Sequence, residues 1–138
     1  MKNILKIFGI LLLLINYSCR AQQMVQVPND TYLLKTNDQQ FLNKPLKNLL
    51  REIKPNIKSV LGTVDSPSYF IFRFIDIDEF KSGKAIGKNH LLICVYVKEP
   101  LDWNFDKRPK GKEYQWTKED EEKYGNLTVI RIKVIGKD

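Results

Sequence analysis

The chain has 138 residues, of which 23 are lysine or arginine and 16 are aspartate or glutamate, so its formal net charge is +7. One histidine excludes metal sites built on several histidines and conventional serine triads, unless a second chain contributes. No catalytic or ligand-binding motif rises above background, and we expect neither a cofactor nor a bound metal.

Residues 1–18 predict an export signal. Lys2 and Lys6 give it a positive start, and residues 7–15 are uninterruptedly apolar. This run is too short for a membrane-spanning helix, which needs roughly 20 apolar residues. We interpret the segment as a cleavable signal peptide or a residual anchor.

The end of this segment resembles the lipobox of bacterial lipoproteins. The run Ser18-Cys19-Arg20-Ala21-Gln22 is similar to the junction in many Bacteroidota-type lipoproteins, in which a small residue precedes the lipidated cysteine. The resemblance implies that Cys19 carries a lipid anchor and that the protein faces the periplasm from the outer membrane. It covers the export signal alone and implies nothing about the fold.

Another processing route stays open. Asn16 stands where the lipoprotein pattern prefers leucine, and a cut after Ala21 would give a soluble periplasmic or secreted protein. On either route Cys19 is lipidated or discarded, which leaves Cys94 without an intramolecular disulfide partner. Cys94 lies in the apolar run 91–97, and we interpret it as a small buried hydrophobe.

The mature chain is basic, because loss of Lys2 and Lys6 with the signal lowers the net charge from +7 to +5. In an envelope protein this charge points to lipid phosphates, an anionic glycan or an acidic protein, and not to nucleic acid. We predict a lipidated tether over 19–30 and a single α+β domain over 31–138.

A basic amphipathic helix is predicted over 43–54. Asn43 is the expected N-cap, Pro45 fits the first turn, and Pro55 ends the helix. The apolar face repeats at helical spacing through Leu46, Leu49, Leu50 and Ile53. The basic positions are Lys44, Lys47, Arg51 and Lys54. Contact of these cations with lipid phosphates is one interpretation, and a solvated face is the one we adopt.

Beyond this helix the apolar period changes to two, which predicts strands. The main strands are expected at 57–64, 68–77, 91–98 and 127–135. A short edge strand is expected at 32–34. A second helix is predicted near 118–124, with Thr117 as N-cap and Gly125 after its end. The economical fold is α+β: one amphipathic helix packed on a four- to five-stranded, mostly antiparallel sheet.

Two long loops interrupt the predicted sheet. The loop 78–90 has glycines and lysines, but their spacing does not match a phosphate-binding loop, and we expect a flexible connection. The carboxylates beside it are interpreted as an acidic strand end instead of a calcium site: Asp76, Asp78 and Glu79. The loop 99–116 mixes aromatic rings with cations. Its rings either project to bind a sugar or a protein, or fold back over the sheet.

One face of the sheet is the predicted binding surface. If the helix covers the side of Phe70, Phe72 and Phe74, the other side displays alternate polar residues beside the tryptophans of the long loop. The candidate binding residues are Tyr69, Arg73, Trp103, Trp116, Arg131 and Lys133. Aromatic rings surrounded by cations suit an acidic protein or an anionic glycan.

The sequence therefore predicts a non-enzymatic binding module of the cell envelope. A first alternative is an inhibitor or immunity-type lipoprotein against a toxin or envelope enzyme, which predicts a projecting aromatic loop at 99–116. A second alternative is a small envelope hydrolase, which predicts a cleft that contains converging carboxylates or His90.

Overall fold

The structure is a computed structural model that describes residues 3–10, 22–84 and 90–136. Cys19 and the predicted cleavage site lie outside the described residues. Residues 3–10 are helical. Within the described part of the chain, no helix is both long enough and apolar enough to cross a membrane.

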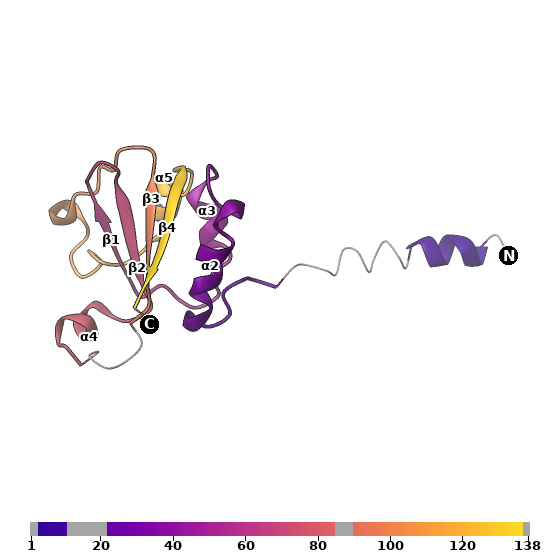
Figure 1. The fold of residues 1–138 in the computed structure, drawn as a ribbon, viewed down its shortest axis with the longest axis horizontal. Helices are drawn as coiled ribbons and strands as arrows, with labels where there is room; N and C mark the ends of the chain where they lie inside the picture. The colour runs from indigo at the N-terminus through magenta and orange to yellow at the C-terminus, as the bar shows by residue number, and fades with distance from the viewer. Residues whose placement is uncertain (1–2, 11–21, 85–89, 137–138) are drawn as a thin grey trace.

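Four antiparallel strands form one sheet in the order β1-β2-β3-β4, so each strand pairs with its neighbours in sequence (Figure 1). The strands are β1 (Ser59–Thr63), β2 (Tyr69–Arg73), β3 (Leu92–Val97) and β4 (Val129–Ile135). This confirms the α+β class and the four main strands. Each strand is shorter than its predicted range, because the flanking residues leave the ladder for bends and irregular segments or, at residue 77, for a helix.

Alternation along the strands gives the sheet one buried face and one open face. Phe70 and Phe72 are fully buried, as predicted, whereas Tyr69 and Arg73 on the other side are partly exposed. Because ladder partners lie on the same face of a sheet, these two faces continue across all four strands, although Ser59 and Cys94 on the open side are themselves buried.

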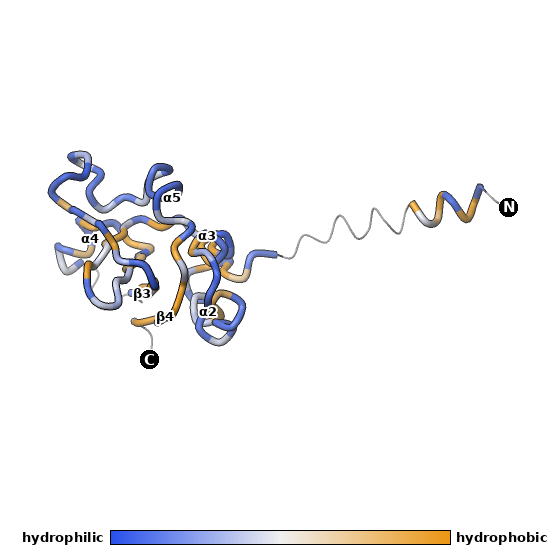
Figure 2. The backbone as a smooth tube through the Cα atoms, turned by 90° about the horizontal axis from the view of Figure 1, so that it is seen from above, coloured by the Kyte–Doolittle hydropathy of each residue, from blue (hydrophilic) through white to orange (hydrophobic). Residues whose placement is uncertain are grey.

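Three short helices cover the buried face, namely α2 (Tyr32–Thr36), α3 (Leu46–Leu50) and α5 (Lys118–Tyr124). Their buried side chains join the strand residues in one core, to which they contribute Leu34, Leu46, Leu49 and Tyr124. In Figure 1, α2 and α3 lie to the right of β4. In Figure 2, α5 is a mainly hydrophilic segment at the edge of the domain.

Helix α3 is shorter than the predicted helix over 43–54. Its N-cap is Pro45 instead of Asn43, whose φ of 61° lies in the left-handed region that asparagine tolerates. The Asn43 N–H donates to the Val129 carbonyl over 2.8 Å, so this residue closes the chain onto β4 before the helix begins.

The second half of the predicted helix pairs with the N-terminal segment instead. Ile53 forms a parallel bridge with Val25, whose N–H donates to the Glu52 carbonyl and whose carbonyl accepts from the Lys54 N–H, both over 2.9 Å. Val25 is fully buried. The folded domain therefore begins within the range 19–30 that was predicted to be a tether, and this boundary was wrong.

The predicted edge strand at 32–34 is also wrong, because these residues belong to α2. The short 3-10 helix η1 (Pro28–Thr31) leads into α2, and the Asp30 carboxylate accepts hydrogen bonds from the N–H groups of Gln26 and Val27 over 3.1 and 3.2 Å. This local cap starts helical structure just before the apolar segment.

Helix α5 is confirmed with its predicted bounds. Thr117 Oγ1 accepts from the Asp120 N–H over 3.2 Å, and Asp120 Oδ2 accepts from the Thr117 N–H over 2.9 Å. This reciprocal pair is a capping box that satisfies two backbone donors at the start of the helix. Gly125 follows the last residue of the helix, as predicted.

The loop predicted over 78–90 contains a helix, α4 (Ile77–Lys81). Asp76 is its N-cap, and Asp78 and Glu79 lie in its first turn. Carboxylates are favourable there because the amino end of a helix is positive. These three residues are thus part of a helix start, and residues 85–89 of the predicted loop lie outside the described residues.

Candidate functional site

The open face of the sheet carries the candidate binding surface. The ladder aligns Tyr69, Tyr96 and Arg131 in one row across β2, β3 and β4. The next row brings Cys94 beside Lys133. We call the outward-facing residues of these strands the open sheet face: Tyr69, Ile71, Arg73, Leu92, Cys94, Tyr96, Arg131, Lys133 and Ile135. All four strand residues predicted to bind lie on it.

Two tyrosines form the centre of the open sheet face. The ring centroids of Tyr69 and Tyr96 are 4.9 Å apart, with planes inclined at 33°. The cations of Arg131 and Lys133 lie 5.5 and 5.6 Å from the centre of the Tyr96 ring. Both cations lie near the distance at which a ring face attracts a positive charge. Sequence reasoning missed Tyr96, although alternation within 91–98 places it opposite the buried valines.

Arg73 lies at the end of this face that is next to α4. Its guanidinium carbon is 4.5 Å from the centre of the Phe80 ring, and Phe80 is itself 42% exposed. Burial lowers the pKa of Arg73, although nearby Cys94 and Tyr114 oppose this shift. The guanidinium has therefore already lost part of its hydration, which reduces the desolvation cost of meeting an anion.

The charge of the open sheet face is uncompensated within the sheet. The strand sequences SVLGT, YFIFR, LICVYV and VIRIKVI contain three cations and no aspartate or glutamate. Cations gathered on one surface attract anions and repel other cations. The face is thus suited to an anionic ligand with apolar parts that cover the tyrosine rings.

The tryptophans do not join this face, and their predicted grouping with Tyr69 and Arg131 is wrong. Trp103 is buried, and Trp103 and Trp116 both make edge contacts with Phe70, at centroid distances of 5.7 and 5.4 Å. Phe70 points into the core, so the two tryptophans of the loop 99–116 fold back over the buried side. This is the second of the two interpretations of that loop.

A buried ion pair holds the loop in this position. Arg108 donates from Nη1 and Nη2 to the two carboxylate oxygens of Asp120 over 2.8 and 2.7 Å. The same guanidinium stacks 3.8 Å from the centre of the Trp103 ring. Burial opposes ionisation of Asp120, but hydrogen bonds from Arg108 and Thr117 outweigh it and lower the pKa of this carboxyl.

Cys94 is buried, as predicted, although it lies on the open side of the sheet. Only 6% of the residue is exposed. Burial raises the pKa of the thiol, and the nearby charges of Lys133 and Arg73 offset this only in part. A thiol that is both covered and protonated is a poor nucleophile.

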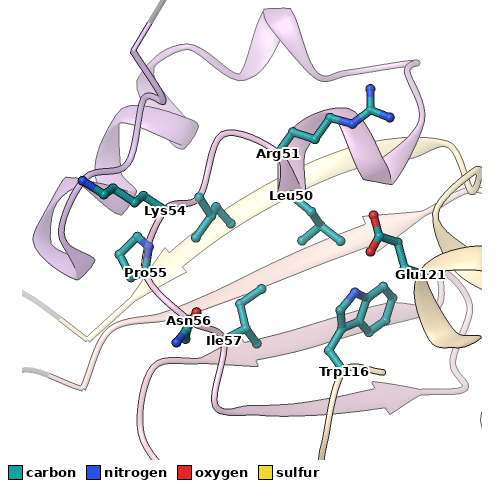
Figure 3. Close-up of a pocket in the computed structure, with 9 residues that line it drawn as sticks. Leu50, Arg51, Lys54, Pro55, Asn56, Ile57, Trp116 and Glu121 are labelled. Atoms are coloured by element: carbon teal, nitrogen blue, oxygen red, sulfur yellow. The ribbon is translucent and has the colours of Figure 1, made fainter. Parts of the chain in front are cut away.

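Several hollows are lined by residues outside the open sheet face, and two of them bear on the candidate functions. A groove of about 590 Å³ runs between the segment after α3 and helix α5, with Leu50, Ile57 and Trp116 as apolar walls (Figure 3). A second hollow of about 390 Å³ beside α4 contains Asp76 and Glu113. The Asp76 side chain is 67% exposed and 3.8 Å from Lys58 Nζ, an arrangement typical of a surface ion pair.

Comparison of the chain with protein-family models, with curated proteins and with solved structures finds no match.

Proposed function

We propose that this protein is a lipoprotein of the cell envelope whose open sheet face binds an acidic surface of a partner protein. The signal at 1–18 and Cys19 support the location, at the outer membrane and facing the periplasm. The stacked tyrosines with cations around them support the binding role. The role is non-enzymatic, and the partner supplies carboxylates.

The observation that carries this proposal is the row Tyr69, Tyr96 and Arg131, flanked by Lys133 and Arg73, in strands that hold no carboxylate. Tyrosine and arginine are enriched among the residues that dominate protein interfaces. Exposed like charges without counter-ions also repel one another, and an acidic partner relieves this repulsion.

Apolar side chains favour a protein partner over a glycan. Ile71 and Leu92 lie between the charged residues and are partly exposed, and Ile135 at the sheet edge is 49% exposed. A protein surface covers such groups with its own apolar side chains, whereas an anionic glycan offers mainly hydroxyls and charges.

The test compares two pairs of charge reversals. Arg131→Glu with Lys133→Glu changes the open sheet face, and Lys110→Glu with Lys112→Glu changes the exposed loop by the same charge. Binding is measured by titration with an acidic peptide of alternating glutamate and leucine, and with polygalacturonate as an anionic glycan. The first pair should weaken peptide binding by more than about tenfold at low salt and less at high salt.

Equal losses for both pairs would show that net charge alone attracts the peptide, and the open sheet face would lose its role. Tight binding of polygalacturonate with no binding of the peptide would make a glycan the partner. Circular dichroism of each variant keeps loss of fold apart from loss of binding.

The anchor is tested separately with Cys19→Ala. Two or more acyl chains give stable membrane attachment, so the variant should appear in the soluble fraction or remain unprocessed. Membrane partition and mature mass equal to those of the natural protein would exclude lipidation at Cys19.

The two alternatives receive less support. An inhibitor or immunity-type lipoprotein was expected to project an aromatic loop, but Trp103 and Trp116 pack against Phe70. A hydrolase needs a general acid in a protected setting, and the Asp76 carboxylate beside α4 is exposed next to Lys58.

A further inference from the structure

We propose that a second surface, formed by Arg51 and Lys54 after helix α3, faces the membrane and contacts anionic lipid headgroups. This rests on the lipid anchor at Cys19 in the proposed function. It concerns a different part of the molecule from the open sheet face, and it follows from where the anchored segment joins the domain.

The anchored segment joins the domain directly at this surface. The Gln23 side-chain amide donates to the Arg51 carbonyl over 2.8 Å, and the Met24 N–H donates to Glu52 Oε2 over 2.9 Å. Next along the chain, Val25 forms its bridge with Ile53. Three consecutive residues therefore fix the start of the domain to residues 51–53, on the side of α2 and α3 in Figure 1.

The chain between this point and the anchor is short. Three residues lie between Cys19 and Gln23, which makes four steps from residue to residue. A fully extended chain spans at most roughly 3.6 Å per step, or about 14 Å in all. A lipid chain attached at Cys19 therefore keeps the surface around residue 51 close to the headgroups. Electrostatic attraction in about 0.1 M salt extends over about 10 Å, a comparable distance.

The charges at this surface have the sign that anionic lipids require. Arg51 and Lys54 are exposed, and both side chains border the groove shown in Figure 3. Neither takes part in an ion pair within the described residues. The segment 19–29 adds Arg20 and contains no aspartate or glutamate. Each such cation near an anionic bilayer strengthens attachment about fivefold.

Lys47, a further basic residue of the predicted helix, is less suitable. It lines a hollow with Lys118, Glu121 and Glu122, so charges of both signs surround it. Glu52 lies between Arg51 and Lys54 in sequence, but its carboxylate accepts the Met24 N–H. The proposed contact is thus centred on the two exposed cations beside the chain start, not on the whole basic face.

The experiment measures contact in the acylated protein itself. The mature lipoprotein is reconstituted into vesicles of phosphatidylcholine alone or with phosphatidylglycerol. A fluorophore on Asn56→Cys, an exposed residue two positions after Lys54, reports quenching by nitroxide-labelled headgroups. Cys94 is buried and leaves the added cysteine as the reactive one.

Phosphatidylglycerol should increase quenching at position 56, and high salt should reverse the increase. Arg51→Glu with Lys54→Glu should lower the contact equilibrium by more than about tenfold. Lys110→Glu with Lys112→Glu, the matched reversal in the loop 99–116, should leave it unchanged.

Quenching that is equal with and without phosphatidylglycerol, or equal in the two reversed pairs, would overturn the proposal. Flotation of the protein with the vesicles reports the anchor independently of this contact. Peptide titration reports the open sheet face, so each proposal can fail alone.

Discussion

Two regions of this protein place arginine against an aromatic ring, and they differ in what holds the arginine. In the loop 99–116, Arg108 stacks on Trp103 and its charge is bound by Asp120 over 2.7 Å. On the open sheet face, Arg131 lies over Tyr96, and the strands provide no carboxylate. The first arginine is part of the fold, whereas no ion pair joins the second to another of the described residues.

The comparison teaches that residue type alone does not distinguish a structural contact from a binding one. Both regions combine aromatic rings with cations, and the loop has the richer sequence pattern. The two regions differ in whether a carboxylate is present. Asp120 accepts hydrogen bonds from Arg108 and also caps α5, so the Arg108 charge is already paired and is not available to a ligand.

The largest expected effect comes from breaking the buried pair. Arg108→Ala should lower the free energy of unfolding by about 3 kcal/mol, because Asp120 is left as a buried charge without its partner. The matched change Arg131→Ala should alter it by less than about 0.5 kcal/mol, as is usual at an exposed site. Urea denaturation of both variants makes the measurement. Similar losses for the two arginines would remove the distinction between the regions.

A somewhat smaller effect is expected at the contact between the loop and β1. A Cβ atom added at Gly62 would lie 2.5 Å from Cγ of Trp103, so the ring must move away. Gly62→Ala should lower the free energy of unfolding by about 2 kcal/mol, as overpacking does in a well-packed core. Thermal unfolding followed by circular dichroism tests this. A variant as stable as the natural protein would mean that Trp103 does not pack on the sheet.

The next prediction concerns the accessibility of the Cys94 thiol on the open sheet face. The thiol should resist labelling reagents in the native state and react on unfolding, because it is covered and its pKa is raised by burial. Cys94→Ala should lower the free energy of unfolding by about 1 kcal/mol. Mass spectrometry after timed labelling provides the readout, and rapid native labelling would show an open path to the thiol.

The smallest expected effect is the pH dependence of the stability that the buried pair of Arg108 and Asp120 contributes. The pKa of Asp120 is lower in the folded than in the unfolded chain, so its stabilising contribution is complete above the unfolded value of about 3.9 and is lost as the pH falls through the folded value. The stability difference between the natural protein and Asp120→Asn should be constant above about pH 5 and shrink below about pH 3.9. A difference that persists in acid would mean that the ion pair does not cause it.

The sequence predicted the elements whose signals are local. The period-two patterns located the four strands, and Thr117 located α5 to the residue. The sequence-based prediction failed where a segment distant in the chain determines the local structure. The helical spacing of apolar residues that ends at Ile53 predicted a helix there, but Ile53 pairs with Val25 instead. Charge alternation likewise placed Arg131 and Lys133 on the open side. Trp103 packs on the buried side of the sheet beneath Arg108, which is held by Asp120, seventeen positions after Trp103. A local sequence pattern does not reveal so distant a partner.

The packing of the loop has a spectroscopic consequence. The chain has two tryptophans, and neither lies on the open sheet face. Emission from Trp103 will follow closure of the loop over the core, whereas Trp116, which borders the groove near Lys54, will respond to changes on that side. A partner on the open sheet face will instead alter Tyr69 and Tyr96. Tryptophan emission thus reports on the loop and the groove, whereas tyrosine emission reports on the open sheet face, in the same unlabelled molecule.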